Sequence, residues 1–182
     1  MKQIIFSTGN NRKVQEARAA CTRFDIIVIQ KELAIDEIQS HSPVDIAIHK
    51  AQEAYALLGA PVVINDSSWN IPALNGFPGG YMKDVNEWLE ADDFLNLMNA
   101  KSDRRVCITE YVVYRDSAAT KIFTKAIWGE IATTACGYGR GVEQVALYKG
   151  RGIGEYQQAG ELIVPPEDDI WIDFANWFSA LK

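Results

Sequence analysis

Histidine and cysteine are scarce in this chain of 182 residues, which has two histidines and three cysteines. A Ser-His-Asp triad or a zinc site would need such side chains in close groups. His41 and His49 share one short segment, and Cys21, Cys107 and Cys136 are far apart in the sequence. The sequence therefore favours neither chemistry, and its odd, widely spaced cysteines are typical of a reducing compartment.

Long apolar runs and an excess of positive charge are also missing. No run approaches the roughly 20 apolar residues of a membrane helix, and residues 1–10 read as a short strand rather than as a signal peptide. The formal net charge of -6 argues against a general nucleic-acid-binding surface but allows a local cationic pocket for a phosphorylated small molecule. We therefore expect a cytoplasmic protein with neither a membrane nor a nucleic-acid partner.

Apolar runs and amphipathic segments alternate along the chain and predict one α/β domain spanning 1–182. The predicted strands are 2–7, 24–29, 61–64, 106–115 and 121–128, the last continuing through 129–132 after a bulge. The predicted helices are 14–21, 43–58, 81–89, 91–99 and 169–181. Residues 135–154 are rich in glycine, which is typical of a mobile surface loop.

The stretch 61–81 contains the main candidate for chemistry. Its short apolar strand is followed by the small polar residues 65–68, which we expect to end the strand. One of them, Asp66, would then stand at the carboxyl end of a central strand, where open α/β sheets bind ligands. A turn or helix-cap role is the alternative interpretation of this residue.

A second motif follows the first predicted strand. Thr8, Gly9 and Asn10 form a polar turn, and Arg12 and Lys13 lie in the first turn of the next helix. Free backbone N–H groups at a helix start attract anions, whereas cations there oppose the helix dipole. Two cations at this point suggest a phosphate partner, and an ordinary turn with two solvated cations is the equal alternative.

Three segments resemble the inosine triphosphate pyrophosphatase family, also called the Ham1-like nucleoside triphosphate pyrophosphatases. The first two are Thr8-Gly9-Asn10 with Lys13 and Glu16, and Glu37-Ile38-Gln39 with Ile46 and Lys50-Ala51. The third is Asp66-Ser67 followed by Ala73-Leu74-Asn75-Gly76-Phe77-Pro78-Gly79, Tyr81 and Lys83. The likeness is good to about residue 85, looser through Gly129-x-Ile131 and poor after about residue 135.

The resemblance implies a fold and an activity. The fold would be an elongated mixed sheet flanked by helices, with two lobes and a cleft between them. The protein would be a homodimer that uses Mg²⁺ to hydrolyse nucleoside triphosphates to the monophosphate and pyrophosphate. Deaminated purines such as inosine and xanthosine triphosphate would be the preferred substrates.

The resemblance also implies roles for individual residues. Glu37 and Asp66 would bind magnesium, which prefers carboxylate oxygens and water, and Asp66 would orient or deprotonate the attacking water. Lys13 and Lys50 would neutralise phosphate charge. The residues expected to contact the nucleotide are Thr8, Gly9, Asn10, Lys13, Lys50, Ser67, Trp69 and Phe77. For Phe77, packing is favoured over stacking on a base, because exposed aromatic rings are the rarer case.

The sequence departs from the family pattern beside the main candidate. The family has two acids before the serine and a glycine after it, whereas this chain has Asn65 and Ser68. An asparagine brings no charge. We therefore expect a site that holds a metal or a base less strongly, or that uses another acid such as Asp36.

A second departure concerns base recognition. Residues 137–144 stand where the family has Phe-Gly-Tyr/Trp-Asp-Pro, with Tyr138 and Glu143 as candidate substitutes. An acidic segment, 165–171, stands where the family has Ser-His-Arg, and no histidine follows His49. An acidic segment in place of a cationic one should change which base is accepted, or whether a base is accepted at all.

These departures leave other hypotheses open. A nucleotide-binding or interaction protein could have kept the fold and lost catalysis, because fold does not fix function. The related Maf-like pyrophosphatases open with Ser-x-Ser-Pro-Arg-Arg, which residues 7–13 do not match. That third hypothesis ranks last.

Overall fold

The chain folds into two compact units in the computed structural model, which describes residues 1–181 apart from the side chain of Pro166. Unit 1 comprises Met1–Ser67, Glu110–Lys125 and Val164–Lys182. Unit 2 comprises Ser68–Thr109 and Ala126–Ile163. Three long strands contribute residues to both units.

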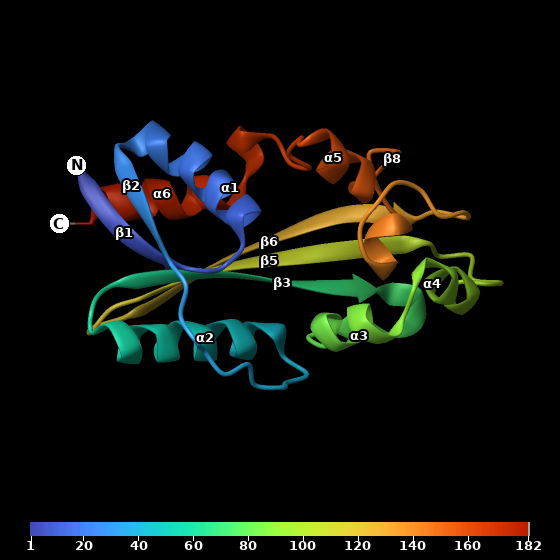
Figure 1. Ribbon diagram of the computed structural model, residues 1–182, viewed down its shortest axis with the longest axis horizontal. Helices are drawn as coiled ribbons and strands as arrows, with labels where there is room; N and C mark the ends of the chain where they lie inside the picture. Colours follow the sequence, from blue (N-terminus) through green and yellow to red (C-terminus); the bar gives the residue numbers. More distant parts are fainter. Residues whose placement is uncertain (182) are drawn as a thin grey trace. The chain divides into compact units, whose positions relative to one another are not determined.

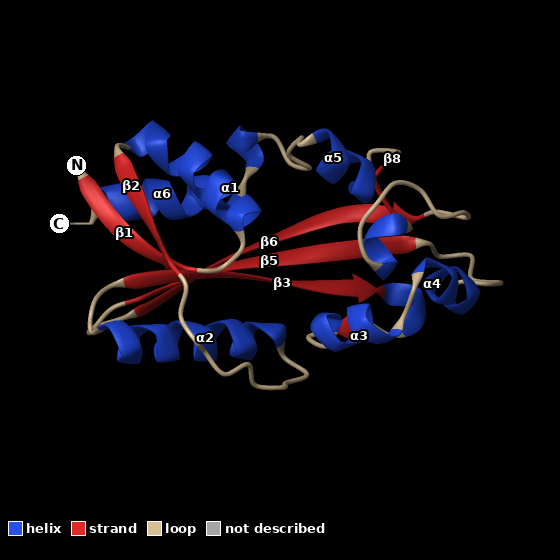
Figure 2. Cartoon of the chain, viewed as in Figure 1, coloured by secondary structure: helices blue, strands red, loops and turns tan. Residues whose placement is uncertain are grey.

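The chain contains both helices and strands in its N-terminal and C-terminal halves (Figure 2). The strands are β1 (Lys2–Ser7), β2 (Ile26–Lys31), β3 (Val62–Ile71), β4 (Phe77–Gly79), β5 (Arg105–Arg115), β6 (Thr120–Ile131), β7 (Ala146–Tyr148) and β8 (Arg151–Gly152). The α-helices are α1 (Asn11–Cys21), α2 (Pro43–Leu58), α3 (Met82–Trp88), α4 (Ala91–Leu97), α5 (Ile153–Ala159) and α6 (Ile170–Ala180). Short 3-10 turns cover Thr22–Phe24, Pro72–Leu74, Gly141–Gln144 and Pro166–Asp168. No helix within residues 1–181 is long and apolar enough to cross a membrane.

Unit 1 is a sheet covered on both faces. Its strands follow the order β2-β1-β3-β5-β6, and β1 runs parallel to both β2 and β3. Helices α1 and α6 cover one face, and α2 covers the other (Figure 1). Neighbouring residues of β3 point to opposite faces, so Val63 packs with α1 and α6 while Val62 and Ile64 pack with α2.

Unit 2 has its own core. In its part of the sheet β4 pairs antiparallel with β3, and β7 pairs antiparallel with β6 and β8. The largest fully buried side chains there include Phe94, Met98 and Ile71. Parallel and antiparallel pairs occur together, which confirms the predicted mixed α/β class.

The predicted end of the strand at residue 64 is wrong. Strand β3 continues through the polar residues 65–68 to Ile71. It can do so because these side chains have partners beside the sheet: the Asn65 amide donates to the Tyr111 carbonyl oxygen, and the Asp66 carboxylate accepts from Lys50. Asp66 therefore lies within a strand, and not in a turn after it.

The glycine-rich stretch is more ordered than predicted. Between residues 135 and 154 the chain forms a 3-10 turn, β7, β8 and the start of α5. Strand β6 runs through Gly129 and pairs with β7. A Cβ at Gly129 would lie 2.1 Å from the Leu147 carbonyl oxygen, so this close pairing requires glycine.

The predicted helices agree closely with the observed ones, although α5 was not predicted. Helix α2 spans Pro43–Leu58, and Gly59 ends it in the left-handed region at φ 63°. Helix α6 begins after Asp169, whose side chain accepts the backbone N–H of Trp171. Local capping signals in the sequence therefore set these helix ends.

Candidate active site

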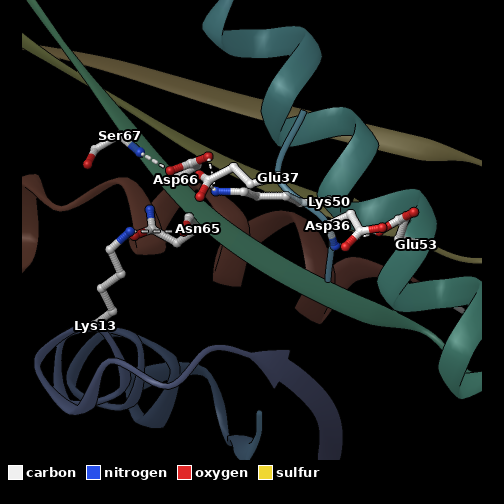
Figure 3. A network of polar contacts seen from close by, with 8 residues as sticks. All are labelled: Lys13, Asp36, Glu37, Lys50, Glu53, Asn65, Asp66 and Ser67. Carbon is white, nitrogen blue, oxygen red and sulfur yellow. Dashed lines mark hydrogen bonds and ion pairs between the residues drawn. The ribbon is translucent and has the colours of Figure 1, made fainter. Parts of the chain in front are cut away.

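Three charged side chains of unit 1 meet beside β3 (Figure 3). Lys50 Nζ, from α2, donates to Asp66 Oδ2 at 2.8 Å and also to Glu37 Oε1. Glu37 reaches this point from the loop between β2 and α2. The side chains of Lys50 and Asp66 are each 21% exposed and that of Glu37 is 38% exposed, so the cluster is accessible to solvent.

Hydrogen bonds to both carboxylate oxygens fix the orientation of the Asp66 side chain. Its Oδ1 accepts the backbone N–H of Ser67 at 2.9 Å, while its Oδ2 accepts from Lys50. A carboxylate has about four lone-pair sites. About two of these remain for a water molecule or a metal ion.

Lys13 lies on α1 and approaches β3 from the face opposite to α2. Its Nζ donates to the backbone oxygen of Asn65 at 3.0 Å. Burial lowers the pKa of the Lys13 ammonium, and the negative charges of Asp66 and Glu110 oppose this in part. Burial also acts to lower the pKa of Lys50, but Asp66 and Glu37 outweigh it and raise that pKa above its usual value. One lysine is thus firmly charged and the other is held closer to losing its proton.

The turn before α1 holds Lys13 in place. Thr8 Oγ1 accepts the Asn10 backbone N–H at 3.1 Å. Asn10 Oδ1 caps α1 by accepting the backbone N–H groups of Arg12 and Lys13 at 3.0 and 3.3 Å. The side chains of Thr8 and Asn10 therefore shape the start of the helix that carries Lys13.

Gly9 lies in the same turn, close to the Glu32 carboxylate. A Cβ at this position would lie 2.6 Å from Glu32 Oε1. A larger residue would have to displace that carboxylate.

Neither residue 65 nor residue 36 adds a carboxylate at the cluster of Glu37, Lys50 and Asp66. The Asn65 amide is hydrogen-bonded to β5 through the Tyr111 oxygen, at 3.3 Å. Asp36 is exposed, and its backbone N–H donates to Glu53 Oε2 at 3.0 Å. The expectation that Asp36 compensates for Asn65 gains no support from this geometry.

Comparison with known proteins identifies the family. The Ham1 family model matches residues 4–151. The chain belongs to the Ham1 family. It is 31% identical over 182 residues to the dITP/XTP pyrophosphatase of Methanosarcina acetivorans, covering 99% of each chain. It is 34% identical over 131 residues to the dITP/XTP pyrophosphatase of Methanopyrus kandleri, covering 71% of this chain and 70% of that one.

Solved structures of Ham1 proteins share the fold. The Ham1 protein of Coxiella burnetii matches with a TM-score of 0.83 at 20% identity, over 100% of both chains. The Ham1 protein of Staphylococcus aureus matches with a TM-score of 0.76 at 21% identity, over 97% of this chain and 98% of that one. The predicted Ham1-like fold, a central mixed sheet flanked by helices, is therefore confirmed.

Two residues that the Ham1 resemblance assigns to the nucleotide belong to unit 2 and pack there. Trp69 is only 7% exposed and lies in the core of that unit. Phe77 packs against the same core, with its ring centroid 6.3 Å from that of Phe94. A packing role for Phe77 agrees with the favoured interpretation of the sequence.

The candidate substitutes for the Ham1 base-reading block differ in their surroundings. Tyr138 is 63% exposed. Glu143 holds its own loop together, because its carboxylate accepts the Arg140 backbone N–H at 3.1 Å and the Gln157 amide at 3.0 Å. Of the two, Tyr138 has the side chain that is exposed.

Glu37 and Asp66 fit a divalent cation, because both carboxylates converge on one ammonium group. Magnesium is commonly held by one or two carboxylates together with waters and substrate phosphates. Among the described residues no group of three or more His, Cys, Asp or Glu side chains could hold a metal. Water and substrate oxygens would therefore complete the coordination.

Sequence reasoning misses one charged neighbour of Lys13. Glu110 lies on β5 and interacts electrostatically with Lys13. The available signal is a lone acid in an otherwise mostly apolar strand, 105–115. Acids seldom occupy such positions unless they are paired.

Proposed function

We propose that this protein hydrolyses nucleoside triphosphates, preferring deaminated purines such as ITP and XTP, to the monophosphate and pyrophosphate. One observation supports this proposal most strongly: Lys50 is hydrogen-bonded to both Glu37 and Asp66 beside β3. Lys13 is hydrogen-bonded to the backbone oxygen of the neighbouring residue, Asn65. The Ham1 relatives named dITP/XTP pyrophosphatases support the choice of substrate.

The two lysines would bind the triphosphate. Ammonium groups act as point charges toward phosphate oxygens, and Lys13 and Lys50 extend from different helices toward the same segment of β3. Neutralising the triphosphate lowers the repulsion that an attacking oxygen meets.

Asp66 would serve as the base. A water molecule on its free lone pairs attacks the α-phosphorus, and the bond from that phosphorus to the oxygen bridging to the β-phosphorus breaks. Asp66 takes the proton of the water, and pyrophosphate leaves. The Ser67 N–H and the Lys50 ammonium keep the carboxylate in one orientation during this step.

Mg²⁺ is the proposed cofactor, with Glu37 and Asp66 as its protein ligands. When bound, it would supply charge neutralisation on the phosphate oxygens. Lys50 bridges the two carboxylates. Its ammonium would therefore be free to turn toward phosphate when a divalent ion takes over that charge.

A pyrophosphate-release assay tests the proposal. ITP, dITP, XTP, GTP and ATP are compared with and without Mg²⁺, using wild type and Asp66→Asn. We expect Mg²⁺-dependent release that is faster for the deaminated purines, and loss of release in the variant. Absence of turnover with every nucleotide would refute the proposal.

Asn65 favours one other function, a nucleotide-binding protein without catalysis. Its amide is bonded to β5 and contributes no charge. Binding of a triphosphate by calorimetry, together with no pyrophosphate release, would support this alternative over the first.

We also propose that the protein is a cytoplasmic homodimer. Membership of the Ham1 family supports the dimer. Sedimentation analysis at micromolar concentration should give twice the mass of one 20.3 kDa chain. A single species at the monomer mass would contradict it.

A further inference from the structure

Glu110 is a partly buried acid on the face of the sheet that α1 and α6 cover. On β5, Val112 and Tyr114 pack with these helices, while Tyr111 and Val113 pack on the α2 face. Side chains alternate along a strand, so Glu110 shares the face of Val112 and Tyr114. Asn65 lies on the same face of the neighbouring strand β3, by the same alternation from Val63.

The charges around Glu110 come from every element packed on that face. Arg12, Lys13 and Glu16 face it from α1, and Asp169 faces it from the start of α6. Burial, followed by the negative charges of Glu16 and Asp169, raises the pKa of Glu110 to about 7, against the smaller opposing effects of Lys13 and Arg12.

A negative partner stabilises the charge of Lys13, which is partly buried. Burial is the main reason that its pKa is lowered, with Lys50 and Arg12 acting in the same direction. Asp66 and Glu110 are the carboxylates that oppose this. Asp66 also accepts from Lys50, on the α2 side of the sheet. Of these two carboxylates, Glu110 is the one on the side of the sheet from which Lys13 approaches.

We propose that Glu110 is a positioning residue of the pyrophosphatase site, which acts through Lys13 by keeping its ammonium group charged and ready for phosphate. This role rests on the function proposed above. It gives the lone acid of β5 a purpose distinct from that of Glu37 and Asp66, which are paired with Lys50.

The pKa of Glu110 and the direction of the shift on Lys13 suit this role. Below about pH 7 Glu110 is mostly protonated. Above that pH it carries the negative charge that raises the pKa of Lys13 against the lowering effect of burial.

The test measures the pKa of Lys13 directly. Lysine labelled with ¹³C at Cε is titrated by NMR in wild type and Glu110→Gln, with Lys13→Arg used to assign the signal. We expect the pKa of Lys13 to fall by about one pH unit in Glu110→Gln, since a nearby opposite charge shifts a pKa by roughly 1–3 units. The alkaline limb of kcat/KM for ITP should move by the same amount.

Asp169→Asn is the matched control. Asparagine keeps the cap of α6 and removes one carboxylate that faces Glu110 but is not among the charges that shift the pKa of Lys13. We expect the pKa of Lys13 to stay within about 0.3 units of wild type, well below the shift expected for an adjacent charge. Glu110→Asp, which keeps the charge, should give a smaller fall than Glu110→Gln.

An unchanged pKa of Lys13 in Glu110→Gln, or an equal fall in Asp169→Asn, would overturn the inference. The NMR titration reads Lys13 without any turnover. A chain that shows the shift but hydrolyses no nucleotide would therefore contradict the proposed function and support the coupling of Glu110 to Lys13.

Discussion

Asp66 can act as the proposed base because its neighbours leave part of its carboxylate free. The Ser67 N–H and the Lys50 ammonium each occupy one oxygen, at 2.9 and 2.8 Å. This holds the side chain without using its remaining lone pairs. A positioned base of this kind typically contributes a factor of roughly 10²–10⁴ to a rate.

Replacing Asp66 by asparagine should therefore lower kcat for ITP by at least about 10². The amide is the same size but takes up no proton. Initial rates of pyrophosphate release measure the effect, with Asp36→Asn as the control because that exposed carboxylate lies outside the cluster. Equal losses in the two variants would argue against a special role for Asp66.

Lys50 should compete with a divalent ion for the two carboxylates. Lys50→Met removes the ammonium that Glu37 and Asp66 share. We expect Mn²⁺ to bind the variant more tightly than wild type by about tenfold without nucleotide, corresponding to roughly 1.4 kcal/mol, while KM for ITP rises. Electron paramagnetic resonance of free Mn²⁺ gives the affinity. Weaker metal binding in Lys50→Met would contradict the assignment of these ligands.

At the scale of single elements, β3 and α1 place the charged groups. Alternation along β3 sends Asp66 toward α2 and leaves the Asn65 carbonyl oxygen for Lys13 from α1. The start of α1 is set by the Asn10 cap. The positions of Asp66 and Lys13 therefore depend on strand register and on one helix cap, whereas that of Glu37 depends on the loop between β2 and α2.

Loss of the Asn10 cap should disturb Lys13 as well as the helix. Asn10→Ala removes the acceptor for the Arg12 and Lys13 N–H groups. We expect the free energy of unfolding to fall by about 1 kcal/mol and KM for ITP to rise. Asn10→Ser keeps a capping oxygen and serves as the control in urea titrations. A stability loss as large in Asn10→Ser would show that capping is not the cause.

At the scale of the whole molecule, helices are more predictable from the sequence than strand ends. The 43–58 helix is marked by proline at its start and glycine after its end, and the structure has it at Pro43–Leu58. Local sequence could not show that β3 continues through residues 65–68, because the partners that keep those polar residues in the sheet come from β5 and α2. Tertiary contacts also decide the 135–154 segment.

The candidate site is partly predictable for the same reason. Its charged residues are expected from motifs, and the structure brings Glu37, Lys50 and Asp66 together. The neighbourhood of Glu110 depends on α1, β5 and α6 packing on one face. No spacing of residues in the sequence predicts that arrangement.

Glu110 should also make the stability of the protein depend on pH. Its pKa is about 7 in the folded chain, against the ordinary value of 4.5. The folded state then binds the proton more tightly, so this stabilisation is present below about pH 4.5 and is lost as pH rises through 7. Glu110→Gln should therefore gain stability over wild type from about pH 5 to about pH 8, on the order of 2–3 kcal/mol at the upper end.

Urea titrations at about pH 5 and about pH 8 measure this difference. Asp103→Asn is the control, because Arg105 holds the pKa of that carboxyl at about 2, and its contribution is constant above about pH 5. A difference between Glu110→Gln and wild type that does not change with pH would contradict the assignment.

The most direct test of the proposed chemistry is hydrolysis of ITP in ¹⁸O-labelled water, followed by mass spectrometry of both products. Attack on the α-phosphorus predicts one ¹⁸O atom in the inosine monophosphate and none in the pyrophosphate, with both products lost in Asp66→Asn. Label in the pyrophosphate, or release of inorganic phosphate and a diphosphate, would contradict it.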